Sequence, residues 1–267
     1  MYKAYVFVKR GFVSMLSYRM AFVLTLLGTF VGAAQFYFMA KFLGEGHEFP
    51  LLAPYGGNLM GYLIIGTTFM SFVGVSLNSF QGAIRGEQQM GTLEFLLMSD
   101  TPLHQILIYS ALWNFVYACL STSVIFLVVV FVLGMDINVN LGAALFILLL
   151  SVVCMSGFGL MSAGIIMVTK QGDPITWAFG TLSGLLSGAM FPVELLPPFL
   201  RTVAVALPPT HALIALRKTI MVHAGLGEVR SQVLALLALT ALTLPIGLVV
   251  FRWGFNRARI DGSLAEY

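Results

Sequence analysis

Long apolar runs, separated by short polar or proline-rich segments, occupy most of this 267-residue chain and constrain its fold more than any other feature. A helix needs about 20 largely apolar residues to cross a bilayer, so runs of this length are typical of membrane-spanning helices. Only 9% of the residues are charged, whereas an ordinary soluble domain has about 25%. The pattern predicts an all-α integral membrane protein with a single transmembrane domain and excludes a separate soluble catalytic domain.

Six transmembrane helices account for the apolar runs. The predicted spans are 20–40, 59–80, 103–133, 141–168, 175–190 and 233–251. The first span follows an interfacial segment, 1–19, and is longer than the apolar part of a signal peptide, so we expect it to be retained. The fifth span provides only about 24 Å of helix, whereas the hydrocarbon core is about 30 Å thick.

The distribution of lysine and arginine predicts the orientation. Six spans place both termini on one side, and basic residues are enriched on the cytoplasmic side of a membrane. With both termini inside, the cytoplasmic set is Lys3, Lys9, Arg10, Arg19, Arg85, Lys170, Arg252, Arg257 and Arg259. The smaller outer set is Lys41, Arg201, Arg217, Lys218 and Arg230. We therefore predict a multi-pass protein of the cytoplasmic (inner) membrane with both termini cytoplasmic and no nucleic-acid partner.

The predicted spans contain no Asp, Glu, Lys, Arg or His at depth. Ion-coupled carriers usually depend on such groups, so that class is disfavoured, although sodium sites made of backbone carbonyls would escape this test. The histidines, His47, His104, His211 and His223, are too widely spaced for a His-x-x-x-His metal pair, and no Walker-type phosphate loop is present. We expect no catalytic residues, no metal site and no cofactor bound by this chain. Any work against a gradient must be powered by another chain.

Residues 83–100 form a predicted amphipathic helix on the cytoplasmic surface, because their polar and apolar side chains fall on different helical faces. The polar face holds Arg85, Gln88, Gln89 and Thr92, and the apolar face holds Met90, Leu93 and Leu97. Two interpretations remain open. The helix either lies at the interface with its polar face in water, or it docks a soluble partner.

This segment resembles the cytoplasmic loop between the second and third spans of type-2 ATP-binding-cassette (ABC) exporter permeases. The resemblance rests on Gly-Glu-x-x-x-Gly-Thr-Leu-Glu-x-Leu-Leu at 86–97, followed by Thr-Pro at 101–102. It implies that 83–100 is a coupling helix, which sits in a groove of an ATPase subunit. Glu87, Gly91, Thr92, Leu93, Glu94 and Leu97 match the motif, and the docking interpretation adds Arg85 and Gln89.

The fifth span carries glycine at every fourth position, at Gly180, Gly184 and Gly188. Small residues at this spacing leave a groove along the helix. In lipid, such a groove favours close approach of two helix backbones. The pattern is consistent with packing inside this chain or with packing near a dimer axis.

Prolines divide residues 191–226 into pieces too short to span, so this segment can only dip into the membrane and return. We predict an outer re-entrant hairpin and an interfacial helix that Thr210 caps. This helix would carry an apolar stripe at Leu213, Leu216 and Ile220, and would offer His211, Arg217, Lys218 and His223 to the interface. We expect Glu194 to be solvated and not to bind a substrate.

The proline-rich pattern is also similar to the same permease family, in which it forms the outer lid of the transport pathway. The matching positions are Gly188, Phe191, Pro192, Leu196, Pro197, Leu207, Pro208 and Thr210.

Together these resemblances imply a permease that pairs with an identical or sister permease chain and binds two copies of an ABC-type ATP-binding subunit. ATP and magnesium would be held by that subunit. The second and fifth spans would line the pathway, with candidate residues at Thr67, Thr68, Ser71, Asn78, Trp177, Phe179, Thr181 and Ser183. Each candidate could equally serve helix packing. We expect export of a hydrophobic or amphipathic substrate, such as a drug, a lipid or a lipid-linked glycan. The alternatives are an ATP-independent channel, an ion-coupled transporter and a non-transporting scaffold.

Overall fold

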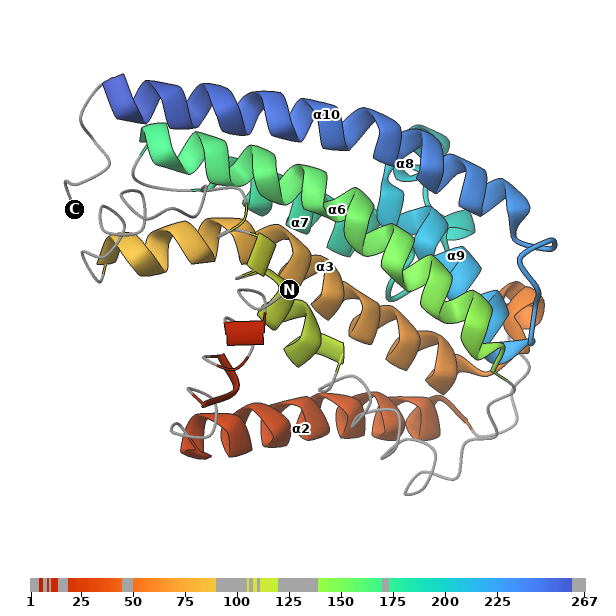
Figure 1. The fold of residues 1–267 in the computed structure, drawn as a ribbon. Helices are drawn as coiled ribbons and strands as arrows, with labels where there is room; N and C mark the ends of the chain where they lie inside the picture. Colours follow the sequence, from red (N-terminus) through yellow and green to blue (C-terminus); the bar gives the residue numbers. More distant parts are fainter. Residues whose placement is uncertain are drawn as a thin grey trace.

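The computed structural model describes residues 5–6, 9, 11–13, 19–44, 50–89, 105, 108–109, 111–119, 139–169 and 173–260. Within these ranges every regular element is helical, which confirms the all-α prediction. The long helices lie side by side in the order α10, α6, α3 and α2 (Figure 1). Their bounds are Arg19–Gly44 for α2, Leu59–Gln89 for α3, Leu141–Thr169 for α6 and Arg230–Ile260 for α10.

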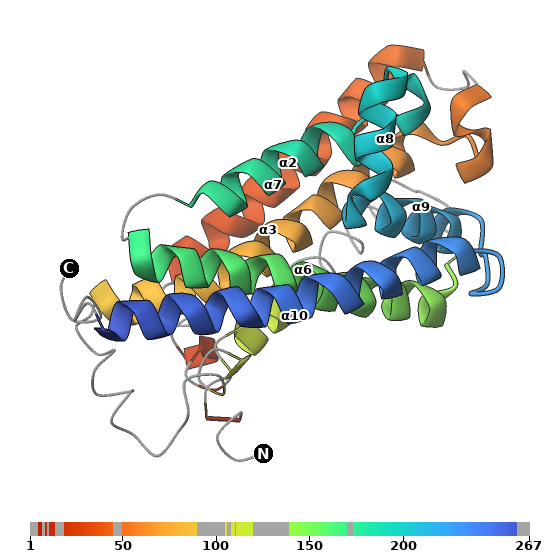
Figure 2. The same ribbon diagram turned by 90° about the horizontal axis from the view of Figure 1, so that it is seen from above.

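Shorter elements gather at one end of the long helices. These are η1 (Pro50–Tyr55), η2 (Val193–Leu195), α8 (Pro198–Ala206) and α9 (Pro208–Met221), with α7 (Pro174–Leu186) leading to them. Both views place α8 and α9 at the end where α6 and α10 begin (Figures 1 and 2). A hydrogen bond from Asn140 N to Thr219 O, 2.8 Å, fixes the start of α6 against α9.

Three helices of the described ranges are long and apolar enough to cross a membrane: α3, α6 and α10. They coincide with the predicted spans 59–80, 141–168 and 233–251. The pair α8 and α9, bent by 83°, would pass the same test as one broken span. The helix α2 covers the predicted first span. The helix α7 covers most of the predicted fifth span and ends at Leu186. Most of the predicted third span lies outside the described residues.

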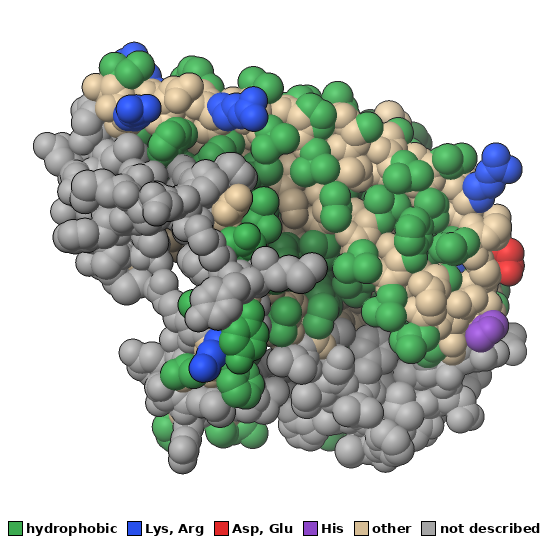
Figure 3. All heavy atoms as spheres, viewed as in Figure 1, with side chains coloured by type: hydrophobic (Ala, Val, Ile, Leu, Met, Phe, Trp, Pro, Cys, Tyr) green, Lys and Arg blue, Asp and Glu red, His purple; other side chains and the backbone are tan. Residues whose placement is uncertain are grey.

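The outer surface of the long helices is suited to a lipid environment. On the face shown in Figure 3, charged side chains lie at the two ends of α10 and at one place on the lower left, and the area between the ends of α10 is mainly hydrophobic or uncharged. Exposed apolar residues along α10 include Leu234, Leu242 and Val249. A large exposed apolar surface of this kind is costly in water and favourable in lipid.

The helices α6 and α10 pack unusually closely along a glycine seam, which consists of Gly157, Gly164, Gly247 and Gly254. A Cβ atom at Gly254 would overlap the carbonyl oxygen of Gly164, and one at Gly247 would overlap that of Gly157. Gly157 therefore faces Gly247, and two helical turns further along both helices Gly164 faces Gly254. Glycine lets the backbones approach in lipid, where association depends on packing and not on burial from water.

Pairs of neighbouring residues show the helix directions. Residue numbers rise together along α6 and α10, from Gly157 with Gly247 to Gly164 with Gly254, so these helices are parallel. The helix α3 is parallel to α6 as well, whereas α7 runs the opposite way. These directions agree with predicted spans two, four and six crossing one way and span five crossing the other.

Candidate functional site

The C-terminal end of α3 contains the first residues of the predicted coupling helix. The helix does not end near residue 80 but continues to Gln89, so the predicted break before residue 83 is absent. Gly82 and Gly86 do not stop it, since an isolated glycine costs a helix only about 1 kcal/mol. Arg85 is half-buried there, and Glu87 and Gln89 lie in the last turn. The other predicted contact residues, Gly91, Thr92, Leu93, Glu94 and Leu97, lie outside the described residues.

One face of α3 carries polar or small residues that are exposed or half-buried. We call this face the α3 stripe; it consists of Thr67, Ser71, Gly74, Asn78 and Gly82. Its polar side chains bond within α3: the Thr67 hydroxyl donates to Leu63 O at 2.8 Å and the Asn78 amide donates to Gly74 O at 2.8 Å. No described atom lies within 4 Å of a Cβ built at Gly74 or Gly82. The predicted candidates Thr67, Ser71 and Asn78 therefore share one open face.

The remaining candidate on α3, Thr68, is buried and turned away from the α3 stripe. The candidates on α7 divide in the same way. Trp177 is 73% exposed and Thr181 is also exposed. Phe179 is buried and stacks on Phe158 with ring centroids 4.0 Å apart, and Ser183 is fully buried. Phe179 and Ser183 therefore pack inside the described part of the chain.

The glycines of α7 also separate into two environments. Nothing in the described residues lies within 4 Å of a Cβ built at Gly180 or Gly184. Gly188 is buried beyond the end of α7 with φ +82°, a conformation that glycine adopts readily, and a Cβ there would lie 2.8 Å from Val193 Cγ2. Only Gly188 is thus used for packing within the described chain.

A chain of polar contacts ties the start of α7 to α6 and α3. The Thr176 hydroxyl donates to Ser162 Oγ at 3.2 Å, and the Ser162 hydroxyl donates to Gln81 Oε1 at 3.5 Å. Ser162 and Gln81 are buried, so these groups satisfy one another in an apolar environment. At the first residue before α7, Asp173 Oδ1 accepts a bond from Thr176 N at 3.0 Å and caps the helix.

Asp173→Ala is expected to lower the free energy of unfolding by about 0.5–2 kcal/mol, because the helix N-cap bond is lost. Asp173→Asn is the matched control, since its amide oxygen can accept the same bond and should preserve most of the stability. Thermal unfolding of the detergent-solubilised protein measures both. Equal losses in the two variants would contradict a capping role.

The predicted outer lid consists of two short helices that meet at a sharp corner. Pro198 and Pro208 stand in the first turns of α8 and α9, where the missing N–H costs no hydrogen bond. At the corner, Leu207 and Pro208 are buried, and a ring nitrogen of His211 lies 2.7 Å from Val205 O. Of the other predicted lid residues, Phe191, Pro192 and Leu196 are half-buried and Pro197 is exposed.

Two predictions for α9 are wrong. Thr210 does not cap the helix, because α9 already begins at Pro208 and its N-cap is Leu207, with no side-chain cap bond. Proline has a backbone φ that suits the first helical turn, so the helix starts earlier than the Thr210 signal suggested. Arg217 is not available to the interface, since it is buried.

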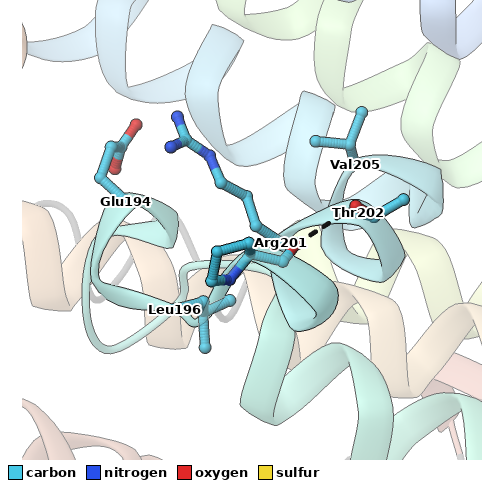
Figure 4. Close-up of a pocket in the computed structure, with 6 residues that line it drawn as sticks. Glu194, Leu196, Arg201, Thr202 and Val205 are labelled. Atoms are coloured by element: carbon cyan, nitrogen blue, oxygen red, sulfur yellow. Dashed lines mark hydrogen bonds between the residues drawn. The ribbon is translucent and has the colours of Figure 1, made fainter.

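An open cavity of about 520 Å³ lies on the lid, between η2 and α8. Its lining combines Glu194 and Arg201 with apolar side chains, and Figure 4 shows the Arg201 side chain extending toward the side of the cavity where Glu194 stands. Glu194 is exposed, as predicted. Burial raises the pKa of the neighbouring Tyr55 phenol, and the Glu194 carboxylate raises it further.

Arg217 lies at the centre of the most densely bonded cluster at this end of the molecule. The Arg217 cluster consists of Tyr62, Gly66, Gly188, Ala189 and Arg217. The guanidinium donates from Nη1 to Gly188 O at 2.8 Å and from Nη2 to Ala189 O at 2.9 Å and Tyr62 O at 3.0 Å. Its Cζ also lies 3.3 Å from the centre of the Tyr62 ring, whose hydroxyl donates to Gly188 O at 2.8 Å.

Sequence reasoning missed this cluster, although a signal for it existed. Arg217 stands four residues after Leu213 and three before Ile220, so it interrupts the apolar stripe that was expected to face inward. A basic residue on the buried face of a helix requires internal partners. Those partners are backbone carbonyls, which carry no signature in the sequence.

Comparison with known proteins supplies the family. The family model described as ABC-2 type transporter matches residues 2–221, most of the chain. Two curated relatives are each named "Probable multidrug ABC transporter permease YbhR", one from Escherichia coli strain K12 and one from Escherichia coli O157:H7. Each is 24% identical over 170 residues, which cover 64% of this chain and 46% of the relative. The match thus spans about half of the relatives' length. With the family model matched over 2–221, this helical membrane chain belongs to the ABC-2 type transporter family of ABC transporter permeases.

Proposed function

We propose that this chain is the membrane-spanning subunit of an ATP-driven exporter of hydrophobic or amphipathic molecules. The observation that carries the proposal is the α3 stripe. It runs from Thr67 to Gly82 along α3, and Ser71, Asn78 and Gly82 are exposed. A polar helix face turned to lipid is unfavourable, so such a face belongs against a water-filled pathway or another protein chain.

The chemistry of the stripe suits uncharged or amphipathic cargo. It offers hydroxyl and amide groups, and α3 contains no Asp, Glu, Lys, Arg or His between residues 59 and 84. On α7, the exposed Trp177 and Thr181 offer an aromatic ring and a further hydroxyl group. The relatives are named as probable multidrug permeases, which supports a drug-like or lipid-like substrate.

A second permease chain is the partner that the α7 surface suits. Gly180 and Gly184 form a groove that the described residues leave empty, and such grooves in membranes favour close pairing with another helix. Pairing two chains along α7 would place the two pathway surfaces near a common axis. The second chain is identical or a sister permease.

The inner end of α3 supports coupling to two ATP-binding subunits. Because α3 is continuous from Leu59 to Gln89, the pathway surface and the start of the motif at 86–97 belong to one rigid element. Those subunits would hold ATP and magnesium, and their closure would move α3 as a lever. In this arrangement the protein lies in the inner membrane with both termini cytoplasmic.

Reversing the charges of Glu87 and Glu94 together tests the proposed function. Opposing like charges at a docking surface cost several kcal/mol, so Glu87→Lys with Glu94→Lys should weaken ATPase binding by about 100-fold or more. Co-purification and ATP-dependent transport in proteoliposomes are the measurements. Glu194→Lys, at the opposite end of the molecule, is the matched control and should leave co-purification unchanged. Normal ATPase binding by the double variant would refute docking through this segment.

A further inference from the structure

Arg217 is the only charged side chain of the described residues that is buried, and it is 1% exposed. It forms no ion pair with any carboxylate in the described part of the chain. Its charge is instead stabilised by backbone carbonyls and by the face of the Tyr62 ring. A buried charge is costly unless it is paired and bonded, and one inside a membrane protein marks a functional position by default.

The bonded carbonyls belong to the place where α7 breaks. The helix ends at Leu186, and Gly188 and Ala189 begin the turn toward the lid. Carbonyl groups at a helix C-terminus lack intrahelical donors and carry partial negative charge, which a cation stabilises. The carbonyls of Gly188 and Ala189 follow the C-cap Ser187, so Arg217 supplies donors to the turn just beyond α7 and places its positive charge near the negative end of that helix.

The same guanidinium joins three elements. It projects from α9, bonds to the carbonyls after α7, and reaches Tyr62 O on α3. Gly66 provides the space, since a Cβ there would overlap Ala189 O and lie 2.6 Å from Arg217 Nη2. A planar guanidinium can bond in several directions and stack on an aromatic ring at once, whereas a lysine ammonium cannot.

We propose that Arg217 is a positioning residue for transport, which fixes the outer ends of α3, α7 and α9 as one body. Movement of the inner end of α3 is thereby carried to the lid helix α8, which lies between α7 and α9. The inference rests on the proposed function, because it presumes that an ATPase moves α3. An apolar side chain in place of Arg217 would be buried at a lower desolvation cost. We therefore expect the cluster to hold the three helix ends in a fixed geometry more than to stabilise the fold.

The test measures ATP-dependent movement of the lid. Val205→Cys on α8, in a background with Cys119→Ala and Cys154→Ala, provides one exposed thiol on the described surface. The full complex with its co-purifying ATPase is placed in lipid nanodiscs, and maleimide labelling rates are compared with and without ATP and vanadate. With Arg217 intact we expect ATP and vanadate to change the labelling rate by about fivefold or more, the lower end of typical couplings between sites. With Arg217→Lys we expect the labelling rate to change by less than about twofold.

Lys218→Gln is the matched control, because it removes the neighbouring cation and should behave as the parent complex does. Thermal unfolding and ATPase co-purification are measured on each variant, so that a simple folding defect is visible. If Arg217→Lys does not accumulate, Tyr62→Phe replaces it; this variant loses only the hydroxyl bond to Gly188 and should reduce the ATP-dependent change in part.

An Arg217→Lys complex with an unchanged response to ATP would overturn the inference while leaving the proposed function standing. Failure of both variants to assemble would assign the cluster to stability alone and would also overturn it. A parent chain that recruits no ATPase would instead remove the proposed function, and this inference with it.

Discussion

Gly254→Ala should lower the free energy of unfolding by about 3 kcal/mol, near the top of the usual range for overpacking. The new Cβ would overlap the carbonyl oxygen of Gly164 on α6. That oxygen belongs to a helix backbone and cannot turn aside as the tip of a side chain could. The helix α10 must therefore move away from α6, and contact along the whole glycine seam is weakened.

Thermal unfolding of the detergent-solubilised protein measures this loss. Gly28→Ala is the matched control, since Gly28 is an exposed helical glycine on α2 with no described atom within 4 Å of its Cβ position. Alanine there should be neutral or should raise stability by up to about 1 kcal/mol through helix propensity. A similar loss in both variants would show that the seam is not close-packed.

Gly66→Ala is expected to destabilise the protein by about 2–3 kcal/mol, for a different reason. The added methyl group would occupy the space in which Ala189 O and the Arg217 guanidinium meet. Displacing either one leaves a buried polar group without its partner. We therefore expect both a lower unfolding temperature and a lid that no longer follows ATP hydrolysis.

The control for Gly66→Ala lies on the same helix. Gly74 is two turns further along α3, and no described atom lies within 4 Å of its Cβ position. Gly74→Ala should therefore retain or slightly raise stability, by about 0.5–1 kcal/mol. If Gly66→Ala were as stable as Gly74→Ala, the close approach of α3 to the end of α7 would be wrong.

The sequence was sufficient to predict the elements that depend on local composition. Apolar length located α2, α3, α6 and α10, and the prolines at 198 and 208 predicted the broken segment that became α8 and α9. Helix ends were less predictable, because neither Gly82 nor Gly86 is strong enough to end α3. The start of α9 was misplaced for a related reason, since proline at its first position outweighs the capping preference of Thr210.

Long-range packing was beyond the reach of sequence patterns. The repeat Gly180, Gly184 and Gly188 attracted attention because its spacing is a familiar helix-pairing motif, yet within the described residues only Gly188 is packed. The glycines that bring α6 and α10 together are seven residues apart on each helix, a spacing that matches no short helix-pairing motif. Their significance lies in the opposite glycine on the other helix, and no single run of residues reveals that pairing.

The acceptors in the Arg217 cluster are main-chain oxygens from Tyr62, Gly188 and Ala189. Main-chain oxygens are present whatever side chain a position carries, so amino-acid replacements at lid positions outside this cluster can accumulate without removing its anchor. The attachment point and the rest of the lid surface can therefore diverge at independent rates. Such separation would let related permeases differ in their lids while keeping the same anchor.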